Sequence, residues 1–148
     1  MKFTSYFATL ATILALATVV CADEIHSCGE ESDLMVYTAK DVKQDKIVLG
    51  EKACVSIKGI LKMPLEKGTT AIITASLGLL TLYDATLQIC EGVSCPISPG
   101  QQTIKICFET PSDGMSDVTV DLNFKVRDQN SKQVICLYGK ATTHSRKH

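Results

Sequence analysis

The sequence predicts an all-β protein, an immunoglobulin-like sandwich in which two sheets of about seven strands in total pack face to face. Apolar and polar residues alternate along several short segments, as they do in strands with one buried face. Turn residues separate these segments, and none shows the periodicity of an amphipathic helix. Because each sheet has one apolar face to cover, we expect two sheets to pack together. The clearest stripe is Val118, Val120, Leu122, Phe124 and Val126.

Three of the expected strands lie in the amino-terminal half. Residues 34–39 form the first candidate, and a polar stretch rich in Lys and Asp follows them. Residues 53–61 alternate between apolar and polar side chains up to the turn at Pro64. Residues 70–82 are the most apolar stretch after the leader, and Gly78 interrupts them where a bulge or a bend would fit.

The carboxyl-terminal half supplies three more strands. Residues 102–110 alternate, and the Pro-Ser-Asp-Gly sequence at 111–114 is a strong turn signal. Residues 118–126 carry the apolar stripe described above, and a polar turn then leads into the last expected strand at 133–141.

The first 22 residues predict a secretory signal peptide. Lys2 supplies a positive charge, residues 6–20 are uncharged and apolar, and Val20-Cys21-Ala22 suits cleavage before Asp23. A membrane anchor is the alternative, but the apolar run is shorter than the roughly 18–20 residues that span a bilayer. We expect a monomeric domain at 23–148 with a polar tail, either secreted or in the lumen of the endolysosomal system.

The chain has seven cysteines, and six remain once Cys21 is removed with the leader. In an oxidising compartment, an even number of cysteines predicts disulfides, here three bonds with fifteen possible pairings. Cys54 and Cys107 fall on the polar faces of their strands and could pair across neighbouring strands. Cys90 and Cys95 are close enough to pair with each other, which leaves Cys28 for Cys136. Zinc held by Cys90 and Cys95 with His144 and His148 is the alternative, but the compartment and the charged tail disfavour it.

Charge and motifs exclude several classes of function. Removing Lys2 leaves 14 basic against 16 acidic residues, a net charge of −2, and no basic stripe with interleaved aromatic residues predicts a nucleic-acid partner. The sequence contains no Gly-x-Ser-x-Gly elbow, no His-Glu-x-x-His motif and no phosphate-binding loop. We therefore predict no enzymatic activity, no cofactor and no metal.

The segment around Gly78-Leu79-Leu80 and Leu87-Gln88-Ile89-Cys90, followed by Cys95-Pro96-Ile97, resembles the ML lipid-recognition domain family and its Niemann-Pick C type 2-like branch. Cys28 and the segment at 134–137 complete the pattern, which covers nearly all of 23–141. The resemblance implies a sandwich whose sheets separate to hold one lipid in an apolar tunnel and carry it between membranes. The apolar pattern alone favours an ordinary filled core, so the tunnel depends on the resemblance.

Within the family, the chain looks closest to phosphatidylglycerol/phosphatidylinositol transfer proteins. Residues 83–89 lack the Pro- and Phe-rich stretch of animal sterol carriers, and the small disulfide loop that those carriers have near the first strand is missing. The resemblance thus implies a phospholipid carrier that contacts membranes transiently. A sterol carrier and a recognition module acting with a protein receptor are the alternatives. An adhesion domain with a filled core is disfavoured because the chain has no Trp.

The family resemblance also suggests where a lipid would bind. The loop after 102–110 would lie at the tunnel mouth, which places Pro111 and Met115 at its rim. The expected wall residues are Ile73, Leu77, Leu79, Leu82, Ile104, Ile106, Phe108, Val120, Leu122, Phe124 and Tyr138.

Overall fold

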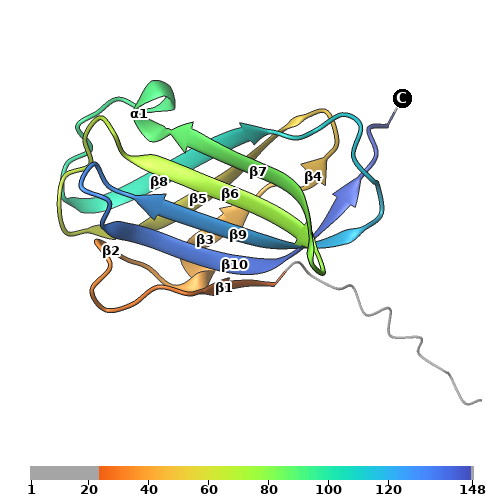
Figure 1. The fold of residues 1–148 in the computed structure, drawn as a ribbon. Helices are drawn as coiled ribbons and strands as arrows, with labels where there is room; N and C mark the ends of the chain where they lie inside the picture. Colours follow the sequence, from red (N-terminus) through yellow and green to blue (C-terminus); the bar gives the residue numbers. More distant parts are fainter. Residues whose placement is uncertain (1–23, 148) are drawn as a thin grey trace, which may run out of the picture.

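The computed structural model describes residues 24–147, which form two packed β-sheets (Figure 1). The predicted signal peptide lies outside the described residues, and no described helix is long and apolar enough to cross a membrane. The described residues form ten strands instead of the expected seven, because several strands of two or three residues pair with the long strands. The predicted two-sheet sandwich is confirmed.

The larger sheet carries most of the strands from the second half of the chain. Along it, each strand is hydrogen-bonded to the next, and a short strand pairs in parallel with the end of β10. The order is β1 (Ile25–Ser27), β10 (Gln133–His144), β9 (Thr119–Arg127), β6 (Thr70–Leu77) and β7 (Leu80–Gln88), and the parallel strand is β4 (Ile47–Val48).

The smaller sheet is built around one long central strand. One edge of this strand pairs along its whole length with β8, and its other edge pairs with two short strands. The central strand is β5 (Lys52–Leu61), and its partners are β8 (Gly100–Glu109), β2 (Met35–Val36) and β3 (Val42–Gln44).

The first expected strand is shorter than predicted. Only β2 is extended, and a 3₁₀ turn, η1 (Ala39–Asp41), follows it. The Asp41 carboxylate accepts hydrogen bonds from the Thr38 amide at 2.9 Å and the Thr38 hydroxyl at 2.8 Å. These bonds lower the pKa of Asp41, and they make this a capped turn instead of a continued strand.

Residues 70–82 form a hairpin, so the expected single strand with a bulge or bend at Gly78 was wrong. Gly78 has φ +60°, a left-handed conformation that suits glycine, and Leu77 pairs directly with Leu80 across the turn. The chain thus reverses at Gly78, and Leu79 is left fully exposed at the tip.

The core lies between the sheets and follows the predicted alternation. The apolar faces of β5 and β8 are buried, and Val120, Phe124 and Val126 of β9 meet them from the larger sheet. The side chains with almost no exposed surface include Ile57, Leu61, Leu65, Ile104, Val126, Val134 and Ile135.

All three disulfides form as predicted. Cys54 and Cys107 are register partners on β5 and β8. Cys90 and Cys95 close a small loop around α1 (Ile89–Gly92). The remaining bond joins Cys28, beside β1, to Cys136 in β10. Because Cys90 and Cys95 are bonded to each other, they are not available as zinc ligands, and no group of His, Cys, Asp and Glu among residues 24–147 could hold a metal.

Candidate functional site

An apolar cavity of about 330 Å³ opens between the sheets at one end of the sandwich. This end carries β4, the 111–118 loop and the C-terminal end of β10 (Figure 1). The wall combines side chains from both sheets with the loop that follows β8. It comprises Ile47, Leu49, Ile73, Ala75, Leu82, Tyr83, Phe108, Thr110, Pro111, Asp113, Gly114, Met115, Val120, Leu122 and Thr143.

No ladder of backbone hydrogen bonds joins the two sheet edges above this cavity. Among residues 24–147, β7 pairs with β6 and β8 pairs with β5, but β7 and β8 do not pair with each other. The short Ala75 side chain lies opposite Leu122 in the β6–β9 register, where a larger residue would fill space. Leu122 is only half-buried although it belongs to the apolar stripe of β9, because it faces the cavity.

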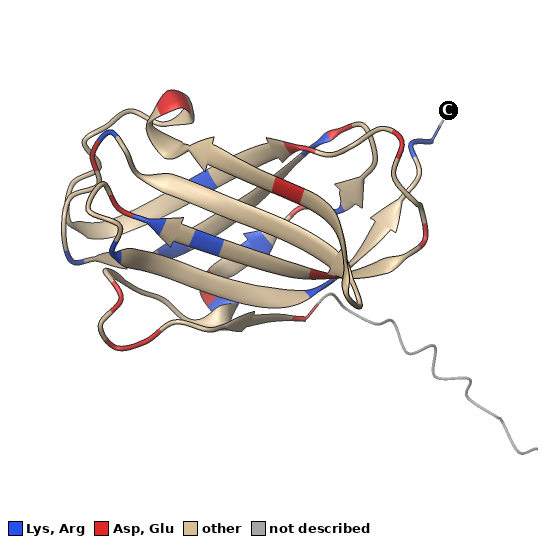
Figure 2. Ribbon diagram, in the orientation of Figure 1, with Lys and Arg blue, Asp and Glu red and all other residues tan. Residues whose placement is uncertain are grey.

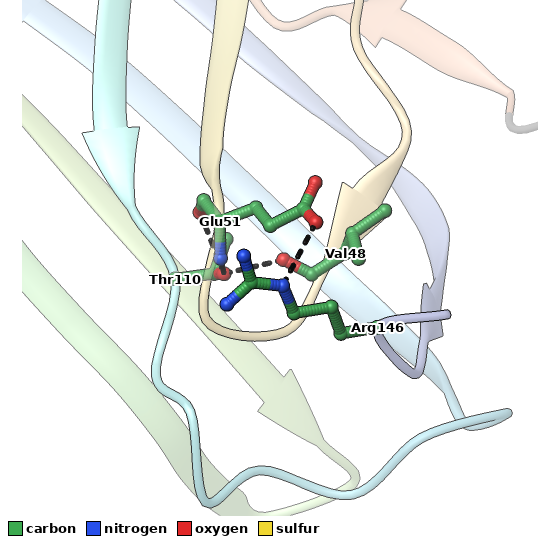
Figure 3. Close-up of polar contacts among 4 residues, drawn as sticks. All are labelled: Val48, Glu51, Thr110 and Arg146. Atoms are coloured by element: carbon green, nitrogen blue, oxygen red, sulfur yellow. Dashed lines mark hydrogen bonds and ion pairs between the residues drawn. The ribbon is translucent and has the colours of Figure 1, made fainter. Parts of the chain in front are cut away.

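One side of the mouth is held by the buried Thr110 (Figure 3). The Thr110 hydroxyl lies 2.6 Å from the Val48 carbonyl oxygen and 2.8 Å from the Glu51 carbonyl oxygen, and it accepts a bond from the Glu51 amide at 3.2 Å. An exposed ion pair of 3.6 Å between Arg146 and Glu51 lies outside this cluster. The end of β8 is thereby tied to the turn between β4 and β5.

The other side of the mouth is held by Thr143 on β10. Its hydroxyl donates to the Met115 carbonyl oxygen at 2.6 Å, and its backbone carbonyl accepts a bond from the Asp117 amide at 2.7 Å. These bonds fix the loop that carries Pro111 and Met115 against the larger sheet. Both threonine hydroxyls in the wall therefore have protein partners already.

The cavity is neutral inside and has one acid at its edge. The Tyr83 hydroxyl donates to the Glu109 carbonyl oxygen at 3.0 Å, and burial, with the nearby Glu109 charge, raises the pKa of Tyr83. None of the described residues that line the cavity is Lys, Arg or His, and the exposed Asp113 is the charged one. Every described Lys and Arg residue is exposed, and Figure 2 shows these residues along the ribbon in strands and loops. The site is therefore suited to an apolar, uncharged group.

Seven of the thirteen residues expected at the site lie together in this cavity: Ile73, Leu82, Phe108, Pro111, Met115, Val120 and Leu122. Ile104 and Ile106 point inward but are buried in the core next to it, and Phe124 borders a smaller pocket behind Leu122. Leu77 and Leu79 lie outside, exposed on the hairpin between β6 and β7.

Tyr138 does not point into the cavity, contrary to expectation. It is half-exposed on the outer face, and its ring lies 5.2 Å from that of His26 in the neighbouring strand. The register shifts between Gln133 and Ile135, and four consecutive residues of β10 are buried. The apolar run at the start of this strand therefore does not reveal which side chains face inward.

Several wall residues were not predicted. Ile47 and Leu49 reach the cavity because β4 pairs in parallel with the end of β10, and no local pattern signals that pairing. Tyr83 and Ala75 could have been found, because each lies within an apolar segment beside predicted residues.

The model of the ML domain family matches residues 22–143. The chain belongs to the ML-domain family. Its members are non-enzymatic lipid-binding proteins, in agreement with the predicted lack of enzymatic activity.

The relatives of this ML-domain chain include a phosphatidylglycerol/phosphatidylinositol transfer protein of Cryptococcus neoformans, 27% identical over 93 residues. The match covers 58% of this chain and 52% of the relative, so the chain spans about half the length of the curated relatives it matches. The solved structure of a Niemann-Pick type C2 protein from the Japanese carpenter ant has the same fold, with a TM-score of 0.61 at 16% identity. That likeness covers 81% of this chain and 98% of the ant protein.

Proposed function

We propose that the protein binds the apolar part of one lipid in the cavity between its sheets and carries the lipid between membranes. The observation that supports this most directly is an apolar cavity whose threonine and tyrosine hydroxyls are already hydrogen-bonded to the protein. Apolar surface that leaves water there gains roughly 25 cal/mol per Å². Membership of a family of lipid-binding proteins supports the same function.

Two lipid classes are candidates for the cargo. The Cryptococcus relative, named for phosphatidylglycerol and phosphatidylinositol transfer, supports an anionic phospholipid. The wall of the cavity favours a neutral lipid such as a sterol, because it contains Asp113 and none of its described residues is basic. An anionic head group would have to remain in water at the mouth, since burying its charge without a partner is costly.

The three disulfides agree with an oxidising compartment, so we place the carrier outside the cell or in the endolysosomal lumen. We expect it to act as a monomer that touches membranes only briefly. A receptor-dependent recognition module would instead form a stable stoichiometric complex with a protein.

The proposal is tested by incubating the oxidised protein with liposomes of phosphatidylglycerol, phosphatidylinositol, phosphatidylcholine and cholesterol, followed by native mass spectrometry. We expect a one-to-one lipid adduct, and transfer of that lipid from donor to acceptor vesicles without another protein. Bare protein with three intact disulfides would contradict the carrier function.

Exposed apolar side chains surround the mouth and form an apolar rim, which we propose touches the bilayer during exchange. The β6–β7 hairpin and the 111–118 loop lie at the same end of the molecule (Figure 1). Insertion of these side chains into a bilayer would remove them from water at the point where a lipid enters. The rim consists of Leu77, Leu79, Leu80, Leu82 and Met115.

Replacing Leu79 with Ser should slow lipid transfer between vesicles by about tenfold, because burial of one leucine contributes roughly 1.5–3 kcal/mol. Equilibrium binding of a soluble lipid analogue should not change, since Leu79 is outside the cavity. Ile60→Ser is the control, because Ile60 is also an exposed aliphatic residue but lies at the end of β5 that is far from the mouth. Equal transfer rates in the two variants would reject the rim as the membrane contact.

A further inference from the structure

A second, much smaller pocket adjoins the main cavity on the side of the edge strands β1 and β3. The two spaces share three wall residues, Ile73, Phe108 and Leu122. The smaller one has a volume of about 20 Å³, against about 330 Å³ for the main cavity. It therefore suits a small group of the ligand better than a long hydrocarbon chain.

Gln44 of β3 lines this small pocket, and its amide is unsatisfied. The Gln44 Nε2 atom is completely buried and has no hydrogen-bond partner among the described residues. A buried donor without a partner costs about 1–3 kcal/mol. Gln44 is the register partner of Val55 on the neighbouring strand β5. Across the pocket, the larger sheet contributes the core residues Phe124 and Leu137.

An ordered water would satisfy this amide poorly. A buried water typically makes about three hydrogen bonds. Gln44 is the partly buried polar side chain in the lining, because the other two polar residues there, Asn123 and Tyr138, are exposed. An oxygen atom of a bound lipid needs only one hydrogen bond, the one to Gln44, because the apolar wall already binds the hydrocarbon part of the lipid. A carboxamide can also turn to donate or to accept, so it can meet either a carbonyl oxygen or a hydroxyl group.

We propose that Gln44 recognises an uncharged oxygen of the bound lipid, either a sterol hydroxyl or an ester carbonyl, in the small pocket beside the cavity. This inference depends on the proposed lipid-binding function and specifies which lipids the site prefers. A phosphate is not the partner, because its charge would be buried in an apolar pocket with no cation in the described wall. Lipids that lack the oxygen leave the Gln44 amide unsatisfied, so they should bind less tightly.

The test measures displacement of the neutral fluorescent probe 1-aminoanthracene by two matched pairs of lipids. The first pair is cholesterol and 5-cholestene, which differ in the 3-hydroxyl group. The second is dioleoylphosphatidylcholine and its diether analogue, which lacks the ester carbonyls. The wild-type protein should prefer the oxygen-bearing member of one pair by about tenfold, and the pair that shows the preference identifies the source of the oxygen.

In the Gln44→Met variant, which has a similar shape and no amide, the preference should disappear through tighter binding of the analogue. The melting temperature of the empty variant should also rise, because an unsatisfied buried donor has been removed. Gln101→Met is the matched control, because Gln101 is exposed on β8, and it should change neither readout.

Two results would overturn the inference while leaving the carrier function intact. One is equal affinity of the wild-type protein for both members of both pairs, which would mean that Gln44 meets only water. The other is a preference that survives in Gln44→Met. Failure of all four lipids and of 1-aminoanthracene to bind would reject the carrier function as well.

Discussion

Replacing Leu122 with Asp should reduce lipid affinity at least about a hundredfold while the protein still folds. Leu122 borders both the main cavity and the small pocket behind it, so the new carboxylate would lie where the lipid is expected. Burying that charge against hydrocarbon costs several kcal/mol. Because Leu122 is only half-buried, the empty cavity can hydrate the carboxylate, and the fold should survive.

Thr119→Asp is the matched control for Leu122→Asp, since Thr119 also belongs to β9, is exposed and lines neither of the two pockets. Binding is measured by native mass spectrometry with the liposome mixture, and folding by circular dichroism. Phe124→Asp would be less informative, because Phe124 belongs to the buried core and the variant should unfold. A folded Leu122→Asp protein that still carries lipid would show that the cavity is not the binding site.

Removing the Cys28–Cys136 disulfide by a double Ala substitution should lower the free energy of unfolding by about 4–5 kcal/mol. The bond joins residues 108 positions apart, and closing a loop of about 100 residues is worth about 4.7 kcal/mol in the chain-entropy model. The physical cause is the restricted unfolded chain, so the native β1–β10 pairing should persist in the variant.

The Cys90–Cys95 disulfide provides the comparison, because it spans only five positions. Its double Ala variant should lose less than about 3 kcal/mol, the value for a loop of 15 residues. Urea unfolding of both variants measures the difference. Equal losses would mean that the two bonds act through native contacts and not through the unfolded chain.

Much of the fold could be predicted from the sequence because side-chain alternation is a local property. The strands around 53–61, 102–110 and 118–126 appear as expected, and their apolar faces are buried. The same alternation placed Cys54 and Cys107 on outer faces, and they are register partners there. The hairpin at Gly78 was missed because a glycine in an apolar run is compatible with a bulge as well as with a reversal.

About half of the predicted site residues meet in the cavity because they share a face with the core. The rest of the wall depends on contacts between distant segments. The parallel pairing of β4 with β10 brings in Ile47 and Leu49, and the register shift at the start of β10 turns Tyr138 outward. Gln44 lies in a polar segment, and only the packing of β3 over the larger sheet reveals its buried amide.

By itself, the sequence determined the strands around 53–61, 102–110 and 118–126, the apolar face of each of them and which cysteines could pair. The physical reason is that backbone pleating fixes side-chain direction residue by residue. Only the tertiary structure decided that the space between the sheets is partly empty and where it ends. A cavity is the volume left after distant side chains have packed, and alternation is the same whether the facing sheet fills that volume or not.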